Sequence, residues 1–152
     1  MSAESRLSEL GIDLPPAARP VASYVPVALA GDLAFVAGQV PLEDGKPMVT
    51  GRLGDDLDTQ EGISWARRCG LQCLAALRGE LGSLDRVTRI AQVSVFVASA
   101  DTYTEQPTVA NGASDLFVEV FGDGGRHARA AVGVPVLPLG APVEVALIAS
   151  VA

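Results

Sequence analysis

The segment from residue 125 to residue 145, GRHARAAVGVPVLPLGAPVEV, constrains the fold more than any other part of the chain. It contains two apolar runs separated by a turn with Pro and Gly at 138–142, and this pattern predicts two strands. The first run begins beside two arginines, including Arg129, and the only histidine, His127, whereas the second run carries a single acid, Glu144. Because an arginine fork matches two oxygens in one plane, we expect a site for a small anion, most simply a carboxylate. An arginine at the start of a strand can instead be a surface ion-pair partner.

The composition limits the classes of protein to which the chain can belong. A chain of 152 residues is about one domain long, and its 49% hydrophobic content, mostly small aliphatic side chains, favours an oligomer. A net charge of −7 without a run of Lys or Arg argues against a nucleic-acid partner. The polar N-terminus and the absence of a membrane-length apolar window predict a cytoplasmic protein without a membrane partner. One histidine with Cys69 and Cys73 does not make a zinc site, so we expect no metal and treat both cysteines as core residues.

The order of the expected elements predicts an α+β fold. Residues 1–20 are expected to form an N-terminal extension and linker, with a short helix at 2–11, and residues 21–152 a single domain. The elements expected in this domain are strands at 23–31 and 33–41, a helix at 58–81, a strand at 87–98, a helix at 107–121, and strands at 129–136 and 143–151. This order, β-β-α-β-α-β-β, predicts two helices on one face of a mixed sheet, whose other face needs a partner.

Two of these elements carry more specific expectations. Asp58 and Glu61 have the spacing of a capping box, which makes the helix that follows them the best supported in the chain. The run at 33–41 is almost continuously apolar, which predicts a strand buried on both faces. The polar, Gly-rich stretch at 42–58 between these two elements is expected to be a solvated connection.

Glu144 shares its strand face with apolar residues, so it is expected to be a lone carboxylate in an apolar row. Burial of that kind raises a carboxyl pKa and suits the group to proton transfer or to holding a water molecule. The alternative is an acid that is paired with an arginine or exposed at an edge. If the last two strands form a hairpin, Glu144 lies opposite residue 136, and more than about 20 Å separates it from Arg129 along the ladder. A site that uses both groups would then have to be built between subunits.

The segment ARAAVGVPVLPLGAPVEVALIA resembles the C-terminal signature of the Rid family, the reactive intermediate deaminases also called the YjgF family. Arg129 falls on the carboxylate-binding arginine of that signature, and Glu144 on its acid. The segment VAGQVP at 36–41 is similar to the family's Ser-Gly-Gln-Ile/Val-Pro motif, and Tyr24 precedes it at the family's spacing. VANGASDLF places Asn111 on the family's helix asparagine, so the resemblance covers most of the chain from residue 21 onward.

The resemblance implies a chorismate-mutase-like fold of the bacillus type, a homotrimer and clefts between subunits. It also implies hydrolysis of enamines and imines to 2-oxo acids and ammonia without a cofactor. In this scheme Arg129 binds the substrate carboxylate, while Asn111 and backbone groups near Gly38 position the rest of the substrate. Glu144 holds or deprotonates the attacking water, and Tyr24 closes the cleft.

Two substrate-binding positions depart from the best-known branch of the family. Ala37 stands where that branch has Ser, and Ala131 stands where it has Cys, so the cleft loses a hydroxyl and a thiol. His127 and the longer loop at 42–58 also lack counterparts there, which indicates a larger, divergent subgroup. The alternative function is therefore a non-catalytic trimer that senses or sequesters a small metabolite. A ribonuclease fits poorly with the acidic charge and the single histidine.

Overall fold

The computed structural model describes residues 1–19 and 22–152. The expected boundary between the N-terminal extension and the domain, at residues 20 and 21, lies outside the described residues. The helices are α1 (Ala3–Leu10), α2 (Thr59–Leu81) and α3 (Gln106–Phe121), and short 3-10 turns occupy Leu84–Arg86, Gly122–Gly125 and Pro138–Gly140. The strands are β1 (Val27–Ala30), β2 (Leu33–Gln39), β3 (Leu42–Glu43), β4 (Lys46–Pro47), β5 (Val87–Ala98), β6 (Ala128–Val134) and β7 (Val143–Val151).

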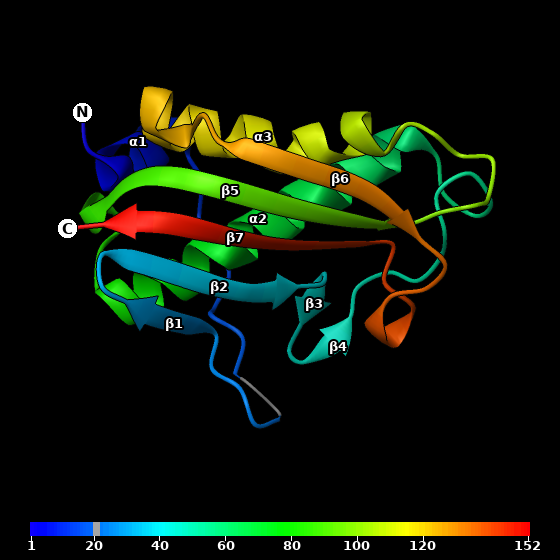
Figure 1. Cartoon of the computed structure of the whole chain (residues 1–152), viewed down its shortest axis with the longest axis horizontal. Helices are drawn as coiled ribbons and strands as arrows, with labels where there is room; N and C mark the ends of the chain where they lie inside the picture. Colours follow the sequence, from blue (N-terminus) through cyan, green and yellow to red (C-terminus); the bar gives the residue numbers. More distant parts are fainter. Residues whose placement is uncertain (20–21) are drawn as a thin grey trace.

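Five strands form one mixed sheet in the order β1-β2-β7-β5-β6. All neighbouring pairs are antiparallel except β5 and β6, which are parallel and are joined by α3. Helices α2 and α3 lie side by side on one face of this sheet, and both chain termini lie at the same end of the molecule (Figure 1). The α+β class and the expected β-β-α-β-α-β-β order are therefore confirmed, with α1 and the small β3–β4 hairpin in addition.

The last two strands do not pair with each other as a hairpin. Strand β5 lies between β6 and β7 and pairs with both. A turn of a few residues favours pairing of the strands it joins, whereas here the β5–α3–β6 crossover places β6 parallel to β5. Strand β6 is consequently an edge of the sheet.

The core lies between the sheet and the two long helices. Side chains from alternate positions of β5 and β7, including Val93, Val95 and Val145, are fully buried against α2 and α3. Cys69 and Cys73 belong to this core as free cysteines, as expected. Helix α2 begins with the predicted capping box, in which the Asp58 side chain accepts the N–H of Glu61 and the Glu61 side chain accepts the N–H of Asp58.

Glycine allows α2 and α3 to approach closely. A Cβ on Gly112 of α3 would lie 2.9 Å from the backbone carbonyl carbon of Ile63 and 3.1 Å from the backbone nitrogen of Arg67, both on α2. Contacts of this length are shorter than van der Waals distance, so only glycine fits at this crossing. The position of α3 relative to the rest of the fold therefore depends on Gly112.

The opposite face of the main sheet is open within the described residues. Phe35 of β2 is 41% exposed, whereas Ala34 and Val36 on either side of it are buried. The prediction that this run is buried on both faces is wrong for the single chain, because α2 and α3 cover only one side of the sheet. Phe35 and Ile148 line a shallow apolar groove of about 230 Å³ on the open face.

The N-terminal segment packs on the domain. Ala3 and Leu7 of α1 are buried, and the Glu4 carboxylate accepts the N–H of Leu84 and pairs with Arg78 at 3.1 Å. None of the helices in the described ranges is long and apolar enough to cross a membrane.

Candidate functional site

Arg129 lies on the edge strand β6 and points toward helix α3. Arg129 pairs with Val93 of β5, whose side chain faces the helices. The Arg129 side chain therefore lies on the helix-covered face of the sheet. Its Nη1 donates to Asn111 Oδ1 at 2.7 Å and to Ser114 Oγ at 3.1 Å, and its Nη2 donates to the carbonyl oxygen of Pro107 at 3.3 Å. All three acceptors lie on successive turns of α3. Arg129 and Asn111, both expected to bind the substrate, are thus in direct contact.

The guanidinium retains free donors after these three contacts. An arginine carries five N–H groups, and the two on Nη1 and one on Nη2 are engaged with α3. Among the described residues, the Nε–H and the second Nη2–H of Arg129 have no acceptor. Because Arg129 is exposed, two donors on a fixed cation are available to a ligand, and a carboxylate has the matching pair of acceptors.

His127 and Ser114 extend this network behind Arg129. The Ser114 hydroxyl lies 2.9 Å from His127 Nε2, and His127 Nδ1 lies 2.6 Å from the carbonyl oxygen of Gly125. The imidazole packs edge-on against Phe117, with ring centroids 5.9 Å apart. Burial, and to a smaller extent the charge of Arg129, lowers the pKa of His127, although its bond to the Gly125 carbonyl opposes this shift. His127 is therefore partly buried, and its lowered pKa favours the neutral form.

Glu144 and Gly38 form a second group on the open face of the sheet. The pairing of β2 with β7 shifts between Val36 and Gln39, so that β2 carries an extra residue at this point. The Glu144 side chain occupies the space above Gly38, and a Cβ on Gly38 would lie 2.9 Å from Glu144 Cδ. Partial burial raises the pKa of Glu144, and its carboxylate has no cationic partner within the described part of the chain. The expected lone carboxylate is present, and Gly38 makes room for it.

One chain does not bring these two groups together. Arg129 and Leu147 both pair with Val93, whereas Glu144 pairs with Phe96, which lies three residues further along β5. Glu144 is on β7, and β5 lies between β7 and β6. About 14 Å therefore separates the Cα atoms of Arg129 and Glu144, and their side chains lie on opposite faces of the sheet. The inference that they cannot meet within one chain holds, although the reason is the intervening β5 and not a long hairpin.

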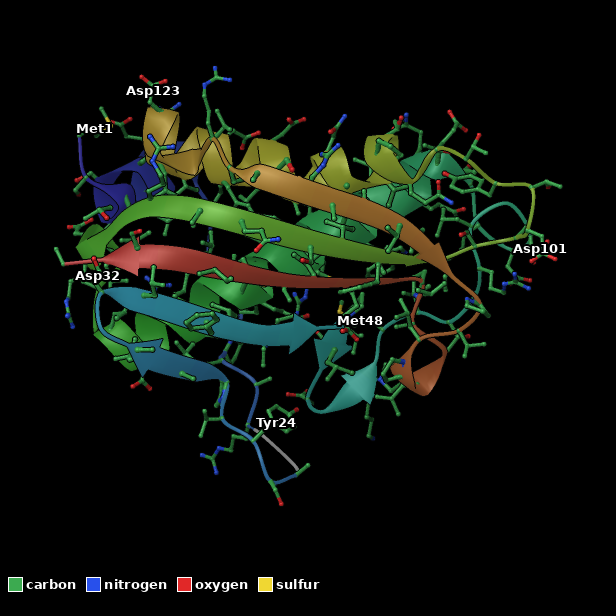
Figure 2. All side chains as sticks on the ribbon, in the orientation of Figure 1. Met1, Tyr24, Asp32, Met48, Asp101 and Asp123 are labelled. Atoms are coloured by element: carbon green, nitrogen blue, oxygen red, sulfur yellow. The ribbon has the colours of Figure 1, made fainter. Side chains whose placement is uncertain are left out.

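The remaining predicted site residues divide between these two groups. Ala131 lies two residues after Arg129 on the same side of β6, and Ala37 precedes Gly38 and donates its N–H to the carbonyl oxygen of Pro26 at 2.9 Å. Tyr24 is 53% exposed and precedes β1, at the edge of the sheet opposite β6 (Figure 2). It is therefore far from Arg129 of the same chain.

Sequence reasoning missed Ser114. Its only signal is its position three residues after Asn111, which places both side chains on one face of a helix. The role of that face became visible only with β6 beside α3. Within the described residues, no three His, Cys, Asp or Glu side chains gather as metal ligands.

The α+β fold with an arginine-centred group at a sheet edge belongs to the chorismate-mutase-like class, and comparisons with known proteins specify the family. The family described as "YjgF/chorismate mutase-like, putative endoribonuclease" matches residues 4–151. Protein TCP17 of Trypanosoma cruzi is 49% identical over 142 residues, which cover 93% of this chain and 89% of TCP17. The chain belongs to the Rid (YjgF) family.

Solved structures agree with this assignment. Atu1372 of Agrobacterium tumefaciens, a protein of unknown function, is 43% identical with a TM-score of 0.90, covering 99% of this chain and 92% of that one. A protein of Shewanella oneidensis described as a "putative endoribonuclease" is 34% identical with a TM-score of 0.94, covering 99% and 100%. A more distant structure, Escherichia coli TdcF with bound serine, shares the fold at 23% identity and a TM-score of 0.61, covering 90% and 93%.

Proposed function

We propose that this protein is a cytoplasmic homotrimer that binds a small carboxylate between subunits and hydrolyses enamine or imine intermediates to 2-oxo acids and ammonia. The observation that carries the proposal is the fixed guanidinium of Arg129, which keeps two N–H donors free beside α3. Membership of the Rid family supports a small-molecule site. The serine bound to TdcF is itself a small molecule with a carboxylate, the group that Arg129 is proposed to bind.

The separation of the two groups supports a cleft between subunits. Arg129 lies at the β6 edge, whereas Tyr24 lies near the β1 edge and Glu144 on the open face. A neighbouring chain that covers the apolar open face, including Phe35, would bury surface that the single chain leaves exposed. Three copies arranged head to tail would close a ring with three equivalent clefts.

The chemistry assigns one task to each group. Arg129 binds the substrate carboxylate in a bidentate manner, and Asn111 of the same chain and the backbone near Gly38 of the neighbouring chain position the reacting atoms. The enamine takes up a proton from solvent at its β-carbon and loses one from its nitrogen, which gives the imine. Glu144 of the neighbouring chain, whose pKa is raised by burial, holds or deprotonates a water molecule that adds to the imine carbon. Collapse of the adduct releases ammonia and the 2-oxo acid, and Tyr24 closes the cleft over the substrate.

A non-catalytic carboxylate-binding trimer is the second candidate. Ala37 and Ala131 favour it, because neither side chain can donate or accept a hydrogen bond in the cleft. Binding of pyruvate without turnover of several enamines would identify a sensor or scavenger. The net charge of −7 argues against RNA as the ligand of either form.

The first test is release of ammonia and 2-oxo acid from enamines generated in situ by a pyridoxal-phosphate lyase. Loss of two charged hydrogen bonds in Arg129→Ala removes about 3 kcal/mol of binding, so activity should fall about 100-fold. Arg126→Ala is the matched control, because Arg126 is an exposed arginine three residues away that pairs only with Asp123, at 3.5 Å, among the described residues. An Arg129→Ala trimer with full activity and affinity would contradict the proposal.

Co-expression tests whether the cleft lies between chains. Arg129→Ala and Glu144→Gln are expected to be inactive when produced alone. In randomly mixed trimers each cleft takes Arg129 from one chain and Glu144 from the next, so about a quarter of the clefts should be intact. Recovery of about a quarter of the wild-type activity supports an inter-subunit site, whereas no recovery would contradict a cleft that uses Arg129 of one chain and Glu144 of the next.

A further inference from the structure

A chain of hydrogen bonds connects the backbone of Gly125 to Arg129. A carbonyl oxygen can only accept, so His127 Nδ1 carries a hydrogen and donates it to Gly125 O at 2.6 Å. The neutral ring then has a lone pair on Nε2, which accepts the Ser114 hydroxyl hydrogen at 2.9 Å. With that hydrogen directed away, the Ser114 oxygen presents a lone pair to Arg129 Nη1 at 3.1 Å.

We propose that Ser114 and His127 are positioning residues for carboxylate binding, because together they fix the rotation of the Arg129 guanidinium so that its Nε–H and one Nη2–H face the ligand. This inference rests on the proposed function, in which Arg129 binds the carboxylate. Ser114 acts through Arg129, and His127 acts through Ser114. Neither side chain touches the ligand in this arrangement.

Helix α3 positions two members of this series of hydrogen bonds. Ser114 is a residue of α3, and Gly125 packs directly against the same helix, since a Cβ at this position would lie 2.8 Å from the Cα of Val118. The His127 ring lies against Phe117 of α3. The Gly125 carbonyl, which determines the His127 tautomer, and the Ser114 hydroxyl, which donates to His127, are therefore both positioned by α3.

The direction in which the Ser114 hydroxyl hydrogen points determines where its oxygen can accept the hydrogen bond from Arg129. A serine within a helix commonly donates its hydroxyl to the carbonyl four residues earlier, and Ser64 of α2 does so with Gln60. In Ser114 the hydroxyl hydrogen goes to His127 instead. Burial keeps the pKa of His127 low, so the acceptor on Nε2 persists at neutral pH.

A hydrogen bond between serine and histidine can also activate serine as a nucleophile. In this protein the hydroxyl oxygen already accepts a hydrogen bond from a cation, Arg129, which withdraws electron density from the oxygen that would attack. The group that follows Ser114 and His127 in this series of hydrogen bonds is the neutral Gly125 carbonyl, which cannot stabilise a protonated histidine as a carboxylate does. The geometry therefore favours positioning over covalent catalysis.

The tautomer is directly measurable because His127 is the only histidine in the protein. A long-range proton–nitrogen NMR spectrum of the ¹⁵N-labelled protein at neutral pH should show hydrogen on Nδ1 and a lone pair on Nε2. Addition of pyruvate should shift the Nε2 resonance in the wild type and leave it unchanged in Ser114→Ala. Hydrogen on Nε2 in the ligand-free protein would overturn the inference.

Affinity for pyruvate, measured by calorimetry, completes the test. Loss of one oriented hydrogen bond should weaken binding about 5-fold in Ser114→Ala and in His127→Phe, which keeps the packing on Phe117. His127→Gln retains an acceptor for the serine and should restore most of the affinity. Ser64→Ala, a helical serine without contact to Arg129, is the matched control and should bind as the wild type does.

The outcomes separate this inference from the proposed function. If Arg129→Ala loses affinity while Ser114→Ala and His127→Phe bind as tightly as the wild type, the proposed function stands and the positioning role is overturned. Equal weakening in His127→Gln and His127→Phe would also overturn it, because the acceptor would then be irrelevant. Failure of the wild type to bind pyruvate or other 2-oxo acids would overturn the proposed function and this inference with it.

Discussion

Replacement of Gly112 by alanine tests whether the contact between α2 and α3 also sets the candidate site. The added Cβ would lie 2.9 Å from the carbonyl carbon of Ile63 and 3.1 Å from the backbone nitrogen of Arg67. Both atoms belong to the backbone of α2, so no rotamer change relieves the overlap. The helices would have to separate by about 1 Å to restore normal contact distances.

The expected cost follows from these contacts. Overpacking against backbone costs about 3 kcal/mol, and the better helix propensity of alanine offsets about 1 kcal/mol, so the net loss is about 2 kcal/mol. For a domain of this size that corresponds to a fall in Tm of about 4–8 °C. Because Asn111 and Ser114 flank Gly112 on α3, the same displacement should move both acceptors away from Arg129 and weaken pyruvate binding.

Thermal unfolding followed by circular dichroism, with calorimetric binding of pyruvate, measures both effects. Gly79→Ala is the matched control: Gly79 is an exposed glycine of α2, and a Cβ there meets only Ala17 Cβ, at an ordinary 3.7 Å. This control should raise Tm by about 2–4 °C, since it gains helix propensity without overlap. A Gly112→Ala protein with unchanged Tm would refute the claim that this crossing admits only glycine.

Two further predictions concern Glu144 and His127. Alanine at Gly38 should force the flexible Glu144 side chain to rotate, at a cost below about 1 kcal/mol. Turnover in the enamine assay should then fall, while the affinity for pyruvate stays at the wild-type value. Unchanged turnover would contradict the assigned position of Glu144. The pKa of His127 is lowered from 6.5 in the fold, so below pH 6.5 the unfolded chain binds more protons than the folded chain and stability falls as pH falls toward the folded pKa. The free energy of unfolding, measured with urea from about pH 7.5 to 5.5, should fall in this way in the wild type and not in His127→Gln. The same pH dependence of this free energy in both proteins would show that His127 is not preferentially neutral in the fold.

Local signals in the sequence were sufficient for most of the fold. The capping box at Asp58 and Glu61 involves residues three apart, so its sequence pattern determines the start of α2 without reference to distant segments. The 12 residues of β5 likewise coincide with the predicted strand, because half of them are β-branched. These elements depend on neighbouring residues, which a sequence shows directly.

Long-range pairing was not accessible in the same way. The short turn before β7 is compatible with a hairpin, whereas the observed neighbour of both β6 and β7 is β5. That arrangement depends on α3 crossing over the sheet, and no residue in the turn encodes it. Arg129 was predicted from its position beside an apolar strand and Asn111 from the family signature, but the contact of Ser114 with Arg129 requires the observed placement of α3 beside β6.

Helix α3 serves two surfaces at once. One side of it packs against α2 through Gly112, and the other side carries the acceptors that hold Arg129. Under the proposed function, substitutions in the interior would therefore change ligand binding, because a shift of α3 relative to β6 moves the acceptors that orient the Arg129 guanidinium. Relatives of this chain could diverge in ligand preference through mutations in the core alone, while every residue in direct contact with the ligand stays the same.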